Sequence, residues 1–286
     1  MLHTLRLALL ACLGLTLHAT TLTSIGADDN GVGRRVTVLD TGTATATPLF
    51  DLNSLDSAFS GITYQASTNT YFAVRTDGFG NSTLASFTLA QNGVFSDVMA
   101  LSTMGTQAFT GGLTYNAADS FFYALANDSN GDSELYRIDV GGNSITALTS
   151  QLGPGYTGGL TLNSADGNLY AIRNDELGVS SLEKFVISGN TATFSTVFDS
   201  FGMGFNGGLF ANGSSFYALG SDMFGLGNLQ NLDSAGALSG LFDTGYGFYN
   251  AGIAAGPDPV PEPATFGLAG AALIAVGIIR RKAGKS

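Results

Sequence analysis

The stretch TGGLTYNAADSFFYALANDSNGDSELYRID, residues 110–139, decides the fold because its pattern recurs along most of the chain. One part of the pattern, a small residue followed by Gly and then Ile or Leu, occurs five times: Ser60-Gly61-Ile62, Gly111-Gly112-Leu113, Gly158-Gly159-Leu160, Gly207-Gly208-Leu209 and Ala251-Gly252-Ile253. The middle glycines are 51, 47, 49 and 44 residues apart. Periods of this length are typical of repeat folds, in which each unit is one supersecondary structure.

Each repeat contains enough material for four short strands. In the repeat that begins with the stretch quoted above, four β-rich runs are separated by turn residues, and they cover residues 112–116, 121–126, 135–140 and 145–152. Four strands in a period of roughly 40 to 50 residues are the signature of a propeller blade.

The two ends of the repeat region complement each other. The N-terminal part supplies runs 22–27, 35–40 and 44–52, equivalent to a second, third and fourth strand, and the C-terminal part supplies only a first strand, 250–255. Together they make one blade, and such a clasp pairs strand edges that would otherwise be exposed. The sequence therefore predicts an all-β, five-bladed β-propeller over residues 20–256, with six blades as the alternative.

The glycine motif begins the strand expected nearest the propeller axis. Five blades converge tightly there, so a residue without a side chain allows close approach of the backbones. The Ile or Leu that follows is expected to pack between blades. Contact with a ligand is the alternative role for these residues.

The composition is acidic. Between residues 20 and 257 there are six Lys or Arg and 20 Asp or Glu, a net charge of −14. Such a surface repels nucleic acid and anionic lipid, and it is compatible with cations, neutral sugars or a basic partner. Solubility alone is an equally good reason for it.

Residues 1–19 are typical of a secretory signal peptide, with Ala19 at the expected cleavage point and the Sec machinery as the export route. A buried first helix and, because of Cys12, a lipoprotein signal are the alternatives. Cleavage would remove Cys12, His3 and His18, which are the only Cys and His residues of the chain. A Ser-His-Asp triad, a Cys-His pair and a His-ligated zinc are then excluded from the mature protein.

Residues 257–286 read as a linker and a tail of three parts. A Pro-Glu-Pro motif within residues 260–263 precedes an apolar segment, 264–279, and a basic end, 280–286. The apolar segment would span roughly 24 Å as a helix, slightly less than the hydrocarbon core of a bilayer, and the basic end is expected to stay in the cytoplasm. The sequence thus predicts a C-terminal transmembrane helix, with a buried terminal helix as the alternative.

This tail resembles the PEP-CTERM sorting signal of Gram-negative bacteria in the order, spacing and position of its parts. The resemblance implies that an exosortase-type peptidase recognises Pro261, Glu262 and Pro263 and processes the chain at or near them. It also implies transient anchoring in the inner membrane, followed by delivery to the outer envelope or to an extracellular biofilm matrix rich in exopolysaccharide.

A set of aspartates ends the second strand of each unit, and in a propeller such positions lie on one face. The members of this candidate ligand face are Asp28, Asp77, Asp128, Asp175 and Asp222, together with Arg75 and Arg173. The favoured interpretation is that the aspartates are turn residues that accept backbone N–H bonds. The alternative is a ring of carboxylates that attracts cations or polyhydroxylated ligands. The two arginines would suit an acidic sugar or a phosphate, although a local Arg–Asp pair explains them more simply.

One loop suggests a metal. Asp128, Asn130, Asp132 and Glu134 place oxygen ligands on alternate residues of a tight loop, which suits a hard cation such as Ca²⁺. The loop resembles the start of an EF-hand, but Gly131 is at loop position 4 instead of 6, and an Asp replaces the final Glu. Ca²⁺ is the only cofactor that the sequence suggests.

The sequence favours a non-enzymatic role, that of an exported surface or matrix protein that binds polysaccharide, another protein or cations through one propeller face. The alternative is a calcium-assisted hydrolase or lyase acting on extracellular glycans or phosphate esters. Its acidic candidate would be the pair Asp175-Glu176, although neighbours in sequence rarely face one substrate. A propeller supports either role. Six tyrosines offer aromatic surface, and most are expected in the core: Tyr64, Tyr115, Tyr123, Tyr136, Tyr170 and Tyr217.

The sorting hypothesis predicts the fate of a variant in which Pro261 and Glu262 are both replaced by Ala. This variant is expected to accumulate at full length in the inner membrane, because the peptidase no longer recognises its site. Membrane fractionation followed by mass spectrometry of the C-terminus measures this, and release equal to that of the natural chain would contradict the hypothesis.

Overall fold

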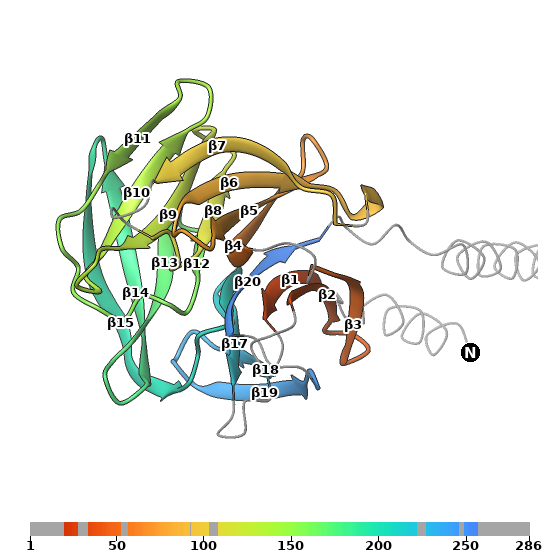
Figure 1. Ribbon diagram of the computed structural model, residues 1–286. Helices are drawn as coiled ribbons and strands as arrows, with labels where there is room; N and C mark the ends of the chain where they lie inside the picture. Colours follow the sequence, from red (N-terminus) through yellow and green to blue (C-terminus); the bar gives the residue numbers. More distant parts are fainter. Residues whose placement is uncertain are drawn as a thin grey trace, which may run out of the picture.

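The computed structural model describes residues 20–27, 34–52, 57–91, 93–102, 108–221, 227–245 and 249–256. It is a ring of five four-stranded antiparallel sheets around one axis (Figure 1). The predicted five-bladed propeller is confirmed, and the alternative of six blades is wrong. The predicted signal peptide and C-terminal transmembrane helix lie outside the described residues. Within the described ranges, no helix has the length and apolar character needed to cross a membrane.

The blades are numbered I to V in ring order, each written from its inner to its outer strand. Blade I consists of β20 (Tyr249–Ala255), β1 (Thr21–Ala27), β2 (Arg34–Asp40) and β3 (Thr45–Asp51). Blade II consists of β4 (Ser57–Gln65), β5 (Thr70–Asp77), β6 (Ser82–Phe87) and β7 (Ser96–Ser102), with a short 3₁₀ helix, η1 (Leu89–Gln91), before β7. Blade III consists of β8 (Leu113–Asn116), β9 (Phe121–Asn127), β10 (Ser133–Asp139) and β11 (Ser144–Ala147). Blade IV consists of β12 (Leu160–Asn163), β13 (Asn168–Asn174), β14 (Val179–Ser188) and β15 (Thr191–Met203). Blade V consists of β16 (Gly208–Asn212), β17 (Ser215–Ser221), β18 (Gly227–Leu232) and β19 (Leu238–Asp243).

Blade I joins the two ends of the chain, as the sequence predicts. Its inner strand β20 pairs antiparallel with β1, so that Ala255 lies opposite Leu22. The Gly256 N–H donates to the Thr21 carbonyl at 2.9 Å. The first and last described residues therefore leave the propeller side by side, on the same face.

The strand boundaries follow the sequence closely, except in the outer strand of blade III. β11 ends at Ala147, whereas the sequence predicts a run to residue 152. The N–H groups of Leu148 and Leu152 still donate to carbonyls of β10, each at 2.8 Å, but the Leu148 carbonyl accepts the Ala192 N–H of blade IV. Both leucine side chains are buried. After β11 the chain thus stops pairing regularly with β10, and its two leucines pack at the interface between blades III and IV.

The hydrophobic core is divided into five clusters, one at each interface between neighbouring blades. At the interface of blades I and II, for example, Ile25 and Val36 pack with Phe59, Tyr71 and Phe87. Since no cluster lies within a single blade, each blade depends on its neighbours for the burial of its apolar side chains.

The five repeat glycines form a closed ring of backbone contacts around the axis. An added Cβ would lie 2.4 Å from Leu113 N at Gly61, 2.4 Å from Leu160 N at Gly112, 2.6 Å from Leu209 N at Gly159, 2.8 Å from Ile253 N at Gly208 and 2.5 Å from Ile62 N at Gly252. The Ile and Leu residues that follow the glycines are all buried. The predicted packing role of the motif is confirmed.

This contact predicts a difference between two glycines that have the same φ. Gly61 and Gly213 both have φ of 63°, but a Cβ on Gly213 meets nothing within 4 Å. Gly213→Ala is expected to lower the free energy of unfolding by about 1 kcal/mol through the left-handed φ alone. Gly61→Ala is expected to lower it by at least about 2 kcal/mol more, because backbone atoms of blade III must move. Equal values from denaturant unfolding would contradict the close contact.

Candidate functional site

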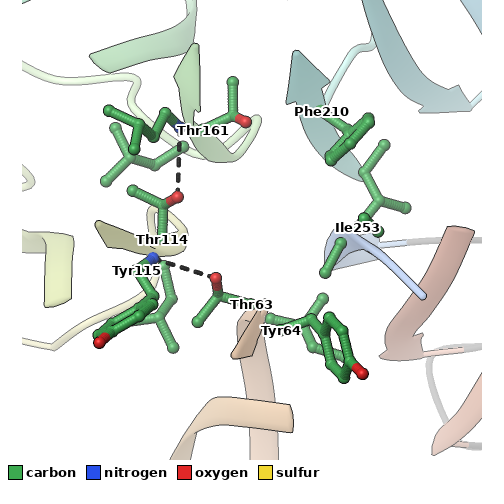
Figure 2. Close-up of a pocket in the computed structure, with 13 residues that line it drawn as sticks. Thr63, Tyr64, Thr114, Tyr115, Thr161, Phe210 and Ile253 are labelled. Carbon is green, nitrogen blue, oxygen red and sulfur yellow. Dashed lines mark hydrogen bonds between the residues drawn. The ribbon is translucent and has the colours of Figure 1, made fainter. Parts of the chain in front are cut away.

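A small pocket lies on the propeller axis, where the inner strands of the blades end (Figure 2). Its volume is about 140 Å³, and all its lining residues are uncharged. The floor is formed by buried Ile and Leu side chains of the glycine motifs, among them Ile62, Leu113 and Leu160. Below this floor, at the level of the glycines, the axis has no room for a water molecule. The pocket is therefore closed at one end and opens on one face of the propeller.

Three threonines connect neighbouring inner strands around the pocket. Thr63 Oγ1 accepts the N–H of Tyr115 at 3.0 Å, Thr114 Oγ1 accepts that of Leu162 at 3.2 Å, and Thr161 Oγ1 accepts that of Ala211 at 3.1 Å. Each threonine is the second residue after its repeat glycine and is at least nine-tenths buried. In Figure 2 the threonines lie on one side of the pocket, and Phe210 and Ile253 lie on the other.

The threonine pattern is broken at two of the five steps. Phe210 and Ala254 occupy the threonine position in blades V and I. The N–H groups that would meet a hydroxyl there belong to Ala255 and Tyr64. Since Tyr64 lies opposite Tyr71, just as Tyr115 lies opposite Phe122, its N–H points away from the second strand and toward the preceding blade.

Ala255 holds the same register, opposite Leu22. Neither Phe210 nor Ala254 has a side-chain acceptor to offer. The pocket thus has one side lined by threonine hydroxyls and one apolar side. Beside the apolar side, the N–H groups of Ala255 and Tyr64 have no threonine acceptor, whereas the three equivalent N–H groups in the other blades each have one.

The candidate ligand face lies at the opposite end of the blades. Asp77, Asp128 and Asp175 follow or end the second strands β5, β9 and β13, whereas the pocket lies where those strands begin. The length of one such strand, roughly 20 Å, separates the two ends. Asp28 and Asp222 lie outside the described residues.

The described aspartates of this face accept hydrogen bonds from backbone N–H groups of their own loops. Asp77 Oδ1 accepts the N–H groups of Phe79 and Asn81, each at 2.9 Å, and Asp175 Oδ1 accepts those of Leu177 and Val179, each at 2.8 Å. Hydrogen bonds from the Asn81 side chain and from these backbone N–H groups lower the pKa of Asp77. The favoured turn role is therefore present in the structure, and it leaves the Phe79 and Leu177 side chains 75% and 79% exposed at the loop tips.

The residues of the calcium hypothesis make similar local bonds. Asp128 Oδ1 accepts the N–H groups of Asn130 and Asp132 at 2.8 and 3.0 Å, and its Oδ2 accepts the Asn130 amide at 3.3 Å. Glu134 accepts the Tyr136 hydroxyl. Among the described residues, no three Asp, Glu, His or Cys side chains gather in a way that would hold a metal. Ca²⁺ binding at this loop stays a prediction.

The two arginines pair with other carboxylates than the expected ones. Arg75 Nη2 lies 2.9 Å from Asp97 Oδ2, on the outer strand of its blade, and only longer-range attraction links it to Asp77. Arg173 donates to the Pro154 carbonyl at 3.1 Å, and its Nη1 lies 3.9 Å from Glu183 Oε1. Glu183 is buried and accepts the Tyr156 hydroxyl at 2.9 Å. The expectation of pairs with the aspartates two residues further along is wrong, because Arg75 reaches past β6 to Asp97 on β7, and Arg173 turns to Glu183 on the neighbouring strand β14.

Sequence reasoning missed the pocket residues. The aligned repeats nevertheless carry a signal, since the second position after the glycine reads Thr, Thr, Thr, Phe, Ala around the ring. Of the six tyrosines, four are core residues as expected, and the half-buried Tyr64 and Tyr115 line the pocket.

The fold and the pocket define the chain as an all-β, five-bladed propeller with a neutral axial pocket. Residues 259–282 match the model of the PEP-CTERM protein-sorting motif, so this segment of the chain carries the sorting motif. The motif indicates export with a membrane-anchored sorting signal that an exosortase processes. A search of curated protein sequences finds no match.

Solved structures share the fold at low sequence identity. A TolB from Acinetobacter baumannii is 11% identical with a TM-score of 0.50, over 82% of this chain and 66% of its own, so this chain spans just under two thirds of that protein. The SapL1 lectin in complex with alpha methyl fucoside is 11% identical with a TM-score of 0.52, over 85% and 88% of the two chains. XC5397 from Xanthomonas campestris, a gluconolactonase, is 15% identical with a TM-score of 0.50, over 79% and 77%. These likenesses concern the fold alone.

The turn role of the aspartates predicts how two substitutions at Asp175 differ. Asp175→Ala is expected to lower the free energy of unfolding by about 1 kcal/mol, because two N–H groups lose their acceptor. Asp175→Asn retains Oδ1 and is expected to lower it by less than half as much. Denaturant unfolding of both variants measures this, and equal losses would contradict the turn role.

Proposed function

We propose that the protein is an exported, non-enzymatic surface or matrix protein that binds neutral polysaccharide through the face that carries the axial pocket. The observation that supports this proposal most directly is the pocket itself. Hydroxyl groups, backbone N–H groups and apolar side chains line it, and its lining residues carry no charge. Sugars present the same mixture of hydroxyl groups and C–H surface, and ligand sites commonly combine an apolar lining with a few placed polar groups.

Electrostatics support a neutral ligand. The net charge of −14 between residues 20 and 257 disfavours nucleic acid and acidic polysaccharide. Among the described residues four basic side chains are engaged by carboxylates, in the pairs Arg35–Asp51, Arg75–Asp97, Arg173–Glu183 and Lys184–Asp166. The Arg137 guanidinium donates to the Gly189 carbonyl and to Asn190 Oδ1 of the next blade. An anionic ligand would find little compensation at these sites.

The sorting motif supports an extracellular setting. An exosortase-type peptidase and the Sec machinery are the processing partners that the tail and the leader imply, and an exopolysaccharide matrix would supply the ligand. Both described chain ends lie on the pocket face, because Ala255 lines the pocket and Gly256 bonds to Thr21. The aspartate face points the other way and offers a second surface, for a cation or another surface protein.

The solved structures support binding and catalysis equally. One similar fold is a lectin with a bound fucoside, and another is a gluconolactonase. The fold therefore does not choose between a binding protein and the alternative, a calcium-assisted hydrolase or lyase. The uncharged pocket favours binding, since general acid–base hydrolysis of a glycoside uses two carboxyl groups beside the substrate.

Retention of the processed, exported protein on immobilised polysaccharides tests this proposal. Neutral polysaccharides are expected to retain it without releasing shorter products. Retention is expected to change less than about twofold between low and high salt, because no charge pairs are involved. Asp175→Asn, on the opposite face, is the control and is expected to bind equally. Product release, or binding that disappears in Asp175→Asn, would contradict the proposal in favour of the enzyme or of the aspartate face.

A further inference from the structure

The pocket also indicates which part of a polysaccharide it recognises. We infer that it takes the acetyl group of an N- or O-acetylated sugar, with the carbonyl oxygen in the place of the hydroxyl that is missing at Ala254. This inference rests on the proposed glycan binding and narrows it to one substituent.

The missing hydroxyl defines where an acceptor is needed. In three steps of the ring a threonine Oγ1 accepts the N–H of the next blade at 3.0 to 3.2 Å. At Ala254 the side chain stops at Cβ, and the register of Tyr64 directs its N–H toward this position, where no side-chain acceptor stands. A backbone donor without an acceptor is unfavourable, because folding takes away the hydrogen bond that water gives it in the unfolded chain. A ligand oxygen at this position would remove that cost.

The other polar groups of the pocket also act as donors. Thr63 Oγ1 and Thr114 Oγ1 each already accept one backbone N–H group, and the hydroxyl proton of each is still available to an acceptor. A ligand with an acceptor oxygen therefore matches the pocket better than one that offers only donors, such as an ammonium group.

The ligand group is neutral and has an apolar part. No positive side chain lines the pocket, so an anion would lose its hydration without gaining a partner. Phe210 and Ile253 lie on the apolar side of the pocket (Figure 2), and Ala254 is also among its lining residues. A carbonyl oxygen with a methyl group next to it satisfies both sides at once.

The size of the pocket agrees with such a group. Its volume of about 140 Å³ is close to that of an engineered protein cavity that binds benzene. This volume accommodates an acetyl group and the edge of the sugar ring that carries it, whereas an entire disaccharide would not fit. The rest of the polysaccharide would lie across the face around Tyr64 and Tyr115.

Calorimetric titration of the processed protein with matched probes tests the inference. The probes are the methyl glycosides of N-acetylglucosamine and of glucose, with sodium acetate as the charged counterpart. The acetylated sugar is expected to bind at least about tenfold more tightly than either of the others, because it alone places a neutral carbonyl and a methyl group together. Equal binding of the two sugars, or tighter binding of acetate, would overturn the inference.

Two substitutions of Ala254 by side chains of similar size, Thr and Val, test whether the acetyl group binds beside this residue. Ala254→Thr and Ala254→Val both place side-chain atoms at the acceptor position and are expected to abolish binding of the acetylated sugar, whereas Phe79→Ser on the opposite face is expected to retain it. Ala254→Thr also supplies Oγ1 to the Tyr64 N–H, so its melting temperature is expected to exceed that of Ala254→Val by several degrees. Unchanged binding in both variants, or equal melting temperatures, would overturn the inference.

The results also separate this inference from the proposed function. Retention on neutral polysaccharide without any preference for acetylated sugars leaves the proposed function standing and overturns the acetyl site. A protein that retains no polysaccharide, acetylated or not, overturns both.

Discussion

The close approach of five glycine backbones at the axis is the constraint on which the rest of the structure depends. A Cβ on any of them would lie within 2.4 to 2.8 Å of a backbone nitrogen of the next inner strand. These contacts bring the inner strands together, close the axis at that level and set the distance between blades. The Ile and Leu residues next in sequence then meet around the axis, where they form the floor of the pocket. The pocket lies directly beyond this floor.

The repeats are most informative where they differ from one another. Three blades place a threonine hydroxyl between neighbouring inner strands, and these bonds link the inner strands at three of the five steps of the ring. Phe210 and Ala254 break the pattern in two adjacent blades, and one of them is the blade that joins the chain ends. The break produces the apolar side of the pocket and leaves two backbone donors without their usual partner. Specific recognition in a symmetric ring requires such a departure, because five identical positions would offer a ligand no preferred orientation.

The acidic residues have a largely structural part in the described chain. Asp77, Asp128 and Asp175 accept the N–H groups of their own loops, and Asp97, Asp166 and Glu183 engage basic side chains. From the sequence, equivalent aspartates can be interpreted as a ring of ligands, because the repeats show that their positions are equivalent. The sequence does not show the hydrogen bonds that these aspartates accept. The same bonds present Phe79 and Leu177 to solvent at the loop tips of that face. The two faces of the propeller thus differ in character, one carrying rigid loops and the other the pocket and both chain ends.

The sequence by itself determined the class of fold, the number of blades, the clasp between the chain ends and the sorting tail. It could do so because periodic glycines, alternating β-rich runs and a tail of fixed order are local patterns, each readable within one repeat or one segment. It also identified the glycines as packing residues, since five strands cannot converge with side chains between them. Only the tertiary structure decided where the polar groups meet. Thr63, Tyr115, Ala254 and Tyr64 come from three different blades, and Arg75 and Arg173 find their partners on other strands of their sheets. Such contacts depend on the strand register and on the angle between blades. Neither can be obtained from the sequence alone.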